Sequence, residues 1–220
     1  MRNKNDAEFT PYHFCNDRSK SDKGFTLMEL LVVMGIIVII SSLILASNTR
    51  FGGAVILQNL AYDIALSIRQ AQVYGISVRG TGASNFNAGY GMYFDTTTNP
   101  KNYVLFADTN GNGLYTISAV DSSERIASTD IGRNYYIDAV CAPATIDGNT
   151  KLCTSPVERL DIVFRRPEPD AYISADSNSC PVLKGSNCKT SARIVAKSPR
   201  GDRMSIIVES NGQIYVEKQY

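Results

Sequence analysis

The sequence is almost without histidine. Its single histidine, His13, lies in a polar stretch near the N-terminus, and none follows residue 24. Ser-His-Asp triads, Cys-His nucleophiles and histidine metal ligands are therefore excluded from residues 25–220. Glu168 and Asp170 each follow a proline in a broken segment, where solvated charges are expected rather than a general acid and base. We predict that the protein is not an enzyme and needs no cofactor.

The sequence also lacks an excess of charge of either sign. It has 22 Lys and Arg residues against 21 Asp and Glu, a net charge of +1. A near-neutral chain without a basic block is not expected to attract nucleic acid through its overall field. A local patch stays open as an alternative, with basic residues on the phosphates and tyrosines stacked on single-stranded DNA. Its members are Arg165, Arg166, Lys197, Arg200, Arg203, Tyr135, Tyr136 and Tyr172.

One long apolar run is present, over residues 25–46, and it contains one charged side chain, Glu29. At 1.5 Å per helical residue the run reaches about 30 Å, the thickness of a bilayer's hydrocarbon core. Three basic residues lie shortly before it: Arg18, Lys20 and Lys23. This asymmetry predicts a single membrane-spanning helix, with the N-terminus in the cytoplasm and the following chain outside.

The cysteines divide at this run. Cys15 precedes it and is expected in a reducing compartment, whereas the other four cysteines follow it into an oxidising one. Four cysteines allow three pairings. We favour the two that are local in sequence, Cys141–Cys153 and Cys180–Cys188, because each closes a short loop rich in Pro, Gly, Asn and Ser. Free or metal-bound thiols are the alternative, which the absence of C-x-x-C spacing disfavours.

The polar stretch of residues 1–24 has mixed charges and no apolar periodicity, so it is not expected to fold. A standard secretory signal has its cleavage site after the apolar core, whereas here the small residue Gly24 precedes the core. The stretch Lys23-Gly24-Phe25-Thr26-Leu27-Met28-Glu29-Leu30-Leu31 resembles the prepilin processing motif of type IV pilins and type II secretion pseudopilins. The resemblance implies that prepilin peptidase, a membrane aspartyl peptidase, cleaves after Gly24 and that the new N-terminal Phe25 is N-methylated.

The same resemblance gives Glu29 a role in assembly. Glu29 is fifth after the cut and matches the family's charged residue, which pairs with the N-terminal amine of a neighbouring subunit. A carboxylate in a bilayer is costly unless it reaches the interface or finds a partner. The amine of Phe25 on an adjacent helix would supply an opposite charge at a similar depth. The alternative is that Glu29 only extends to the cytoplasmic interface.

The pattern beyond residue 46 predicts a second helical segment. Asn48 with Gly52 and Gly53 predicts a loosened or bent turn rather than ideal helix. Apolar residues at helical spacing then predict an amphipathic helix over residues 54–74 that stops at Gly75. Its apolar stripe consists of Leu57, Leu60, Ala61, Ile64, Ala65, Ile68 and Ala71. Residues 60–71 resemble the H-type minor pseudopilins and the FimT-type minor pilins.

Short β-branched or aromatic segments follow, bounded by Gly, Asn, Asp or Pro, and they predict strands. The predicted ranges are 90–94, 103–108, 114–117, 124–127, 134–137, 160–164, 191–196, 204–209 and 213–217. Asn211-Gly212 predicts a hairpin between the last two strands. We expect a pilin-like α+β fold, in which a long N-terminal helix, with a membrane-spanning half and an amphipathic half, packs on a mostly antiparallel β-sheet.

The stretch Asp108-Thr109-Asn110-Gly111-Asn112-Gly113 has oxygen ligands at alternate positions, as at the start of a calcium loop. The glutamate that closes such a loop is absent, because the twelfth position is Ala119, and the flanks are expected to be strands. A similar turn connects strands in H-type pseudopilins. We therefore expect a structural turn, with calcium bound by Asp108, Asn110 and Asn112 as the alternative.

These patterns predict four segments: a prepilin leader that is removed (residues 1–24), a transmembrane and polymerisation helix (25–46), an amphipathic helix and connection (47–79), and an extracytoplasmic β-rich globular domain (80–220). The expected function is that of a minor pilin or pseudopilin, a structural subunit of a type IV pilus or a type II secretion pseudopilus.

The expected location is the inner membrane before assembly and the filament after it. Expected partners are other pilin or pseudopilin subunits, prepilin peptidase, the inner-membrane assembly platform and membrane lipid. The alternative function is DNA binding by a minor pilin for natural competence, since FimT-type minor pilins have been linked to DNA uptake.

Overall fold

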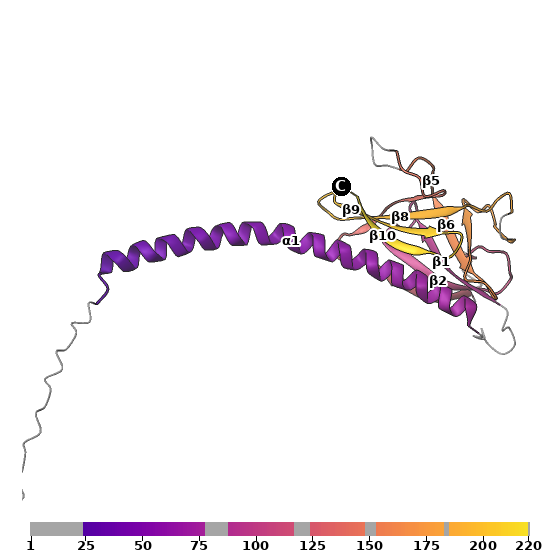
Figure 1. Cartoon of the computed structure of the whole chain (residues 1–220), viewed down its shortest axis with the longest axis horizontal. Coiled ribbons are helices and arrows are strands. Elements are labelled where there is room, and N and C mark those ends of the chain that lie inside the picture. Colours follow the sequence, from indigo (N-terminus) through magenta and orange to yellow (C-terminus); the bar gives the residue numbers. More distant parts are fainter. Residues whose placement is uncertain (1–23, 78–87, 117–123, 148–152, 183–184, 220) are drawn as a thin grey trace, which may run out of the picture. The chain divides into compact units, whose positions relative to one another are not determined.

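The structure is a computed structural model that describes residues 24–77, 88–116, 124–147, 153–182 and 185–219, without the side chains of residues 46–51 (Figure 1). These residues form one helix, α1 (Leu27–Ile76), and ten strands. The strands are β1 (Gly89–Asp95), β2 (Asn102–Asp108), β3 (Arg125–Asp130), β4 (Tyr136–Cys141), β5 (Pro156–Val157), β6 (Arg159–Phe164), β7 (Ala171–Ala175), β8 (Ser191–Lys197), β9 (Arg203–Glu209) and β10 (Ile214–Gln219). The chain divides into two compact units, Met1–Ala46 and Ser47–Tyr220.

Helix α1 is assigned without a break across residues 47–53, so no turn interrupts the helix there. A glycine inside a helix costs about 1 kcal/mol. The hydrogen bonds of the long helical stretches on both sides offset this cost. The helix ends at Ile76, one residue beyond the predicted stop. Gly75 instead permits close packing, because a Cβ there would lie 2.4 Å from the backbone oxygen of Phe164, the last residue of β6.

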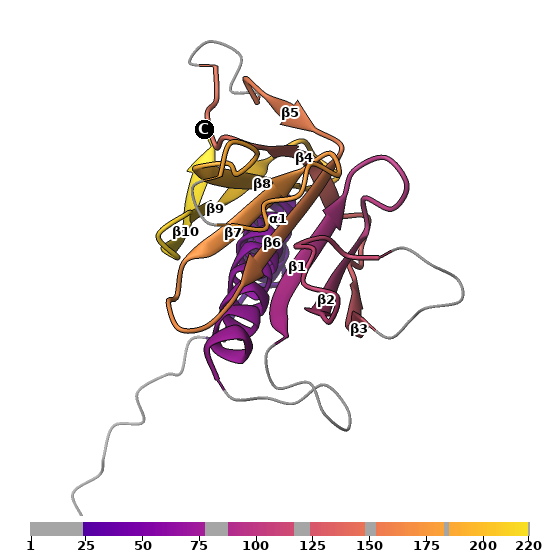
Figure 2. The ribbon, with the colours of Figure 1, turned by 90° about the vertical axis from the view of Figure 1, so that its right-hand side faces the viewer.

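The strands form two five-stranded sheets, and every pairing between the described strands is antiparallel. The order is β3-β2-β1-β6-β7 in the first sheet and β10-β9-β8-β4-β5 in the second. One apolar core joins the inner faces of both sheets to the part of α1 in the second unit. Figure 2 shows β8–β10 on one side of α1 and β1–β3 on the other. This is the predicted α+β arrangement, built with two sheets.

The buried face of α1 follows the predicted helical spacing. Leu60 is partly buried against the core, and the other members of the stripe are at most 9% exposed. Those buried members are Leu57, Ala61, Ile64, Ala65, Ile68 and Ala71. Residues three and four apart share one face of a helix, so this stripe is what places α1 against the sheets.

Residues 114–116 are not a strand, contrary to the prediction, and Ile117 lies outside the described residues. Their backbone N–H groups donate to side-chain oxygens, at 2.8, 2.8 and 2.9 Å. The donor and acceptor residues are Leu114 and Asn112, Tyr115 and Asp161, and Thr116 and Glu124. Side-chain acceptors thus satisfy the backbone where a strand ladder was expected. Strands β5 and β7 have no counterpart in the prediction.

The predicted hairpin joins β9 to β10. The Gly212 N–H donates to the Glu209 carbonyl, and the Glu209 N–H donates to the Gln213 carbonyl, both at 2.9 Å. Three residues lie between Glu209 and Gln213, and the last of them, Gly212, has a φ of +82°, which glycine adopts without strain. Gln72 Nε2 on α1 donates to the carbonyls of Gly212 at 2.9 Å and Pro169 at 3.0 Å, which ties the hairpin to the helix.

Two disulfides join Cys141 to Cys153 and Cys180 to Cys188, the sequence-local pairings that the sequence favours. Their sequence separations are 12 and 8 residues. A closed loop of this length stabilises a domain by about 2–3 kcal/mol by restricting the unfolded chain. Cys15 lies outside the described residues.

Candidate processing and assembly site

The start of α1 is fixed by a threonine cap. Thr26 Oγ1 accepts a hydrogen bond from the Glu29 N–H at 3.2 Å, and the Thr26 carbonyl accepts one from the Leu30 N–H at 3.1 Å. Helical residues begin at Leu27, so Thr26 is the N-cap and Glu29 is the third helical residue. Threonine followed three residues later by glutamate is the sequence of a capping box. An acidic side chain in the first turn is also favoured by the helix dipole.

The predicted cleavage position lies just outside this cap. Gly24 and Phe25 have no regular secondary structure. The Phe25 side chain is 80% exposed, and a Cβ built on Gly24 would have no atom within 4 Å. The structure thus places the Gly24–Phe25 bond in open, non-helical backbone, two residues before the helix.

The first half of α1 is apolar on all sides. Residues Leu27–Leu45 have a mean hydropathy of 2.7, and none of this stretch is buried among the described residues. It is the one described helix long and apolar enough to cross a membrane. Glu29 is its only charged residue. A helix that is apolar on all sides requires lipid or other apolar helices around it.

The chain matches the family model of the prokaryotic N-terminal methylation motif over residues 19–45. The match spans the candidate cleavage position, the cap, Glu29 and the apolar helix. The match indicates an N-terminal segment of the kind found in type IV pilin-like and pseudopilin precursors. Comparison with curated proteins and with solved structures gives no match.

The motif and the apolar helix together fit a membrane-anchored pilin, and the motif favours a structural subunit over an enzyme. The finer resemblance of residues 60–71 to H-type and FimT-type proteins has no match and stays a prediction. In the structure Arg69, within that stretch, donates to the Ile214 carbonyl at 3.4 Å and so contacts β10.

The Asp108 turn hydrogen-bonds to its own side chains. Asp108 Oδ2 accepts from the Gly113 N–H at 2.9 Å, and Asn110 Oδ1 accepts from the Asn112 N–H at 2.9 Å. Gly111 and Gly113 have φ values of +75° and +77°, which glycine adopts freely. Asp108 Oδ2 and Asn110 Oδ1 thus serve as acceptors within the turn, which supports the structural interpretation.

The guanidinium of Arg165 binds the carboxylate of Asp108. Arg165 Nη2 donates to Asp108 Oδ2 and, at 2.9 Å, to the Gly111 carbonyl, while Nη1 donates to the Pro181 carbonyl at 3.1 Å. The Arg165 guanidinium also lies 5.3 Å from the centre of the Tyr172 ring. The described residues contain no group of three or more His, Cys, Asp or Glu side chains placed to hold a metal. Calcium binding at Asp108, Asn110 and Asn112 stays a hypothesis.

The basic residues of the DNA hypothesis are largely engaged in ion pairs. Lys197 and Arg203 both bind Asp138, at 3.0 and 2.8 Å. Burial alone raises the pKa of Asp138, but hydrogen bonds from these two cations outweigh burial and hold the pKa below its ordinary value. Arg165 directly follows β6, a strand of the other sheet, and pairs with Asp108. Tyr135 is buried and donates to the Gly53 carbonyl at 3.1 Å, so its ring is not available to stack on a base.

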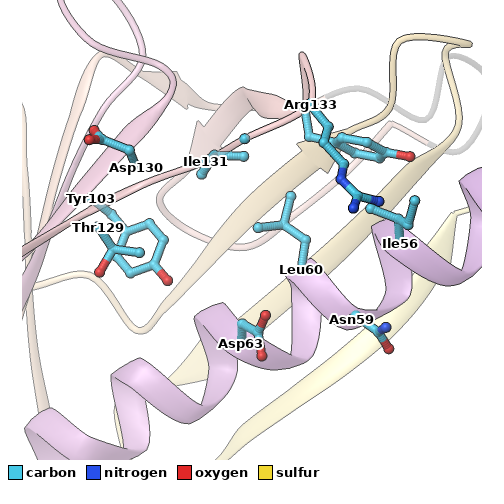
Figure 3. Close-up of a pocket in the computed structure, with 11 residues that line it drawn as sticks. Ile56, Asn59, Leu60, Asp63, Tyr103, Thr129, Asp130, Ile131 and Arg133 are labelled. Atoms are coloured by element: carbon cyan, nitrogen blue, oxygen red, sulfur yellow. The ribbon is translucent and has the colours of Figure 1, made fainter.

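A pocket of about 370 Å³ lies between α1 and the segment that follows β3 (Figure 3). Leu60 and Ile56 project into it from α1, opposite Ile131, and Asp63 and Arg133 lie near its rim. Its lining contains neither histidine nor cysteine. The pocket offers an apolar floor with a few charges and no pairing of a nucleophile with a base.

The sequence did not predict the ion pairs of two buried carboxylates, Asp161 and Asp108. Asp161 is fully buried on β6 and pairs with Arg159 at 2.9 Å, and Asp108 is paired with Arg165. A signal was present in the first case, since Asp161 interrupts the apolar run Leu160–Phe164. A charge inside a buried strand requires a partner, but the sequence does not say which arginine provides it.

Proposed function

We propose that the chain is a minor pilin or pseudopilin, a structural subunit of a type IV pilus or a type II secretion pseudopilus. It enters the inner membrane as a precursor, with Arg18, Lys20 and Lys23 on the cytoplasmic side. Prepilin peptidase cleaves after Gly24, and Phe25 becomes the methylated N-terminus. The assembly platform then transfers α1 from lipid into contact with other pilin subunits.

The observation that carries this proposal is the unburied apolar helix, which starts with the methylation motif. Lipid and neighbouring apolar helices both satisfy such a surface, so the helix can serve as an anchor before assembly and as a packing element afterwards. Contacts between different surfaces of successive subunits propagate into an open filament. The environment of Glu29 differs between the lipid anchor and the filament. In the filament its carboxylate gains a cationic partner, because the amine of a neighbouring Phe25 lies beside it.

The test replaces Glu29 by glutamine, which keeps the size of the side chain and removes its charge, and by alanine. Both variants should remain in the membrane fraction, because an apolar helix inserts at least as well without a carboxylate. Their share in sheared filaments, measured by immunoblot, should fall at least about tenfold, equivalent to 1.4 kcal/mol of lost subunit contact. Incorporation of both variants at the wild-type level would contradict the proposed assembly role.

A further inference from the structure

One hydroxyl group determines where α1 begins. The Glu29 N–H donates to Thr26 Oγ1, whereas in a helix that continued upstream it would donate to the Phe25 carbonyl, four residues before it. Gly24, Phe25 and Thr26 lie outside the helix. The Thr26 side chain therefore accepts the Glu29 N–H hydrogen bond that the Phe25 carbonyl would accept if Phe25 were part of the helix.

If the cap at Thr26 is lost, the apolar surroundings of α1 favour extension of the helix toward the N-terminus. The residues from Leu27 onward form the apolar span. An N–H without a partner costs several kcal/mol at the hydrocarbon boundary, so a helix that loses its cap gains by recruiting upstream carbonyls rather than by fraying. Extension by one turn would place the Gly24–Phe25 peptide in helical backbone. Peptidases cleave opened, non-helical backbone, and sites held in helices must open first.

We propose that Thr26 is a positioning residue for the processing reaction. Its hydroxyl ends the helix two residues after the Gly24–Phe25 bond and keeps that bond in the open conformation that the peptidase requires. This inference rests on the proposed function, since it concerns the cleavage of the precursor.

The test compares the full chain in detergent micelles with two variants. Thr26→Val keeps the shape of the side chain and removes the acceptor, and Thr26→Ser keeps the acceptor. With added prepilin peptidase, kcat/KM for Thr26→Val should fall about fivefold, the factor that corresponds to the usual contribution of an N-cap. Thr26→Ser should be cleaved at nearly the wild-type rate.

A second readout separates positioning from direct recognition of the hydroxyl. Without peptidase, the carbon-13 Cα shift of Phe25 should move toward its helical value in Thr26→Val and not in Thr26→Ser. Equal cleavage of Thr26→Val and wild type would overturn the inference, as would slow cleavage of Thr26→Val with an unchanged Phe25 shift. Failure of the peptidase to cleave wild type would instead overturn the proposed function, and the Phe25 shift would still report whether Thr26 sets the helix start.

Discussion

Removing the guanidinium of Arg165 should destabilise the unit Ser47–Tyr220 strongly. The Asp108 side chain is 0% exposed, and its Oδ1 has no hydrogen-bond partner among the described residues. Arg165→Met also removes the hydrogen bonds to the carbonyls of Gly111 and Pro181. Among the described residues, the carboxylate would then keep the Gly113 N–H as a donor. Breaking a buried pair in this way costs about 3–5 kcal/mol, since a buried charge is left without compensation.

The assay is thermal unfolding of the full chain in detergent micelles, followed by the near-ultraviolet circular dichroism of its tyrosines. At about 2–4 °C per kcal/mol for a unit of this size, Arg165→Met should lower the melting temperature by roughly 6–20 °C. The matched control is Arg125→Met on β3, where the side chain is exposed. It should leave the melting temperature close to that of wild type.

The double variant Asp108→Asn with Arg165→Met tests the cause of the loss. It removes the charge that Arg165 compensates, so it should be more stable than Arg165→Met alone. A melting temperature of Arg165→Met within about 2 °C of wild type would refute the reasoning, because it would mean a loss below about 1 kcal/mol. A double variant no more stable than the single one would refute it as well.

Three further substitutions test the packing of α1 and the ion pairs of the second sheet. Gly75→Ala should lower the stability of the fold by about 1–3 kcal/mol, because the new Cβ would lie 2.4 Å from a backbone oxygen of β6. Gly52→Ala is the control: its Cβ would meet no atom within 4 Å, so it should raise the stability slightly in the same melting assay. Asp138→Asn should cost about 1 kcal/mol at pH 7. The lowered pKa of Asp138 means that its ion pairs stabilise the fold above the ordinary value of 3.8 and are lost as the pH falls through the lowered pKa. Asp138→Asn should thus flatten the decline of melting temperature below about pH 4, and an unchanged decline would contradict this assignment.

The parts of the fold governed by local pattern could be predicted from the sequence. Apolar residues at helical spacing predicted the buried face of α1, and Asn211-Gly212 predicted the β9–β10 hairpin. The charge asymmetry predicted the topology and the motif around Gly24 predicted the candidate cleavage position, since both patterns are short and continuous in sequence. The cap at Thr26 also has a local signature, Thr-x-x-Glu, which sequence reasoning overlooked.

The remaining features depend on pairings between distant segments. Strand β7 follows two prolines, and its five residues gain strand structure by pairing with β6. Residues 114–116 have strand-like composition but donate to side chains that include Asp161, 46 positions from Tyr115. Arg165 appeared as a surface cation for DNA, and only the fold shows that it reaches Asp108, 57 positions away. A single sequence does not encode such partners in any local pattern.

The most direct test of the central claim is the mass of the mature N-terminus. The protein isolated from its own membranes should yield an N-terminal peptide that begins at Phe25 and carries one additional methyl group on its α-amine. No peptide from the leader should accompany it in the mature form. A mature chain that begins at Met1, or at any residue other than a methylated Phe25, would contradict the proposal that this protein is a processed pilin subunit.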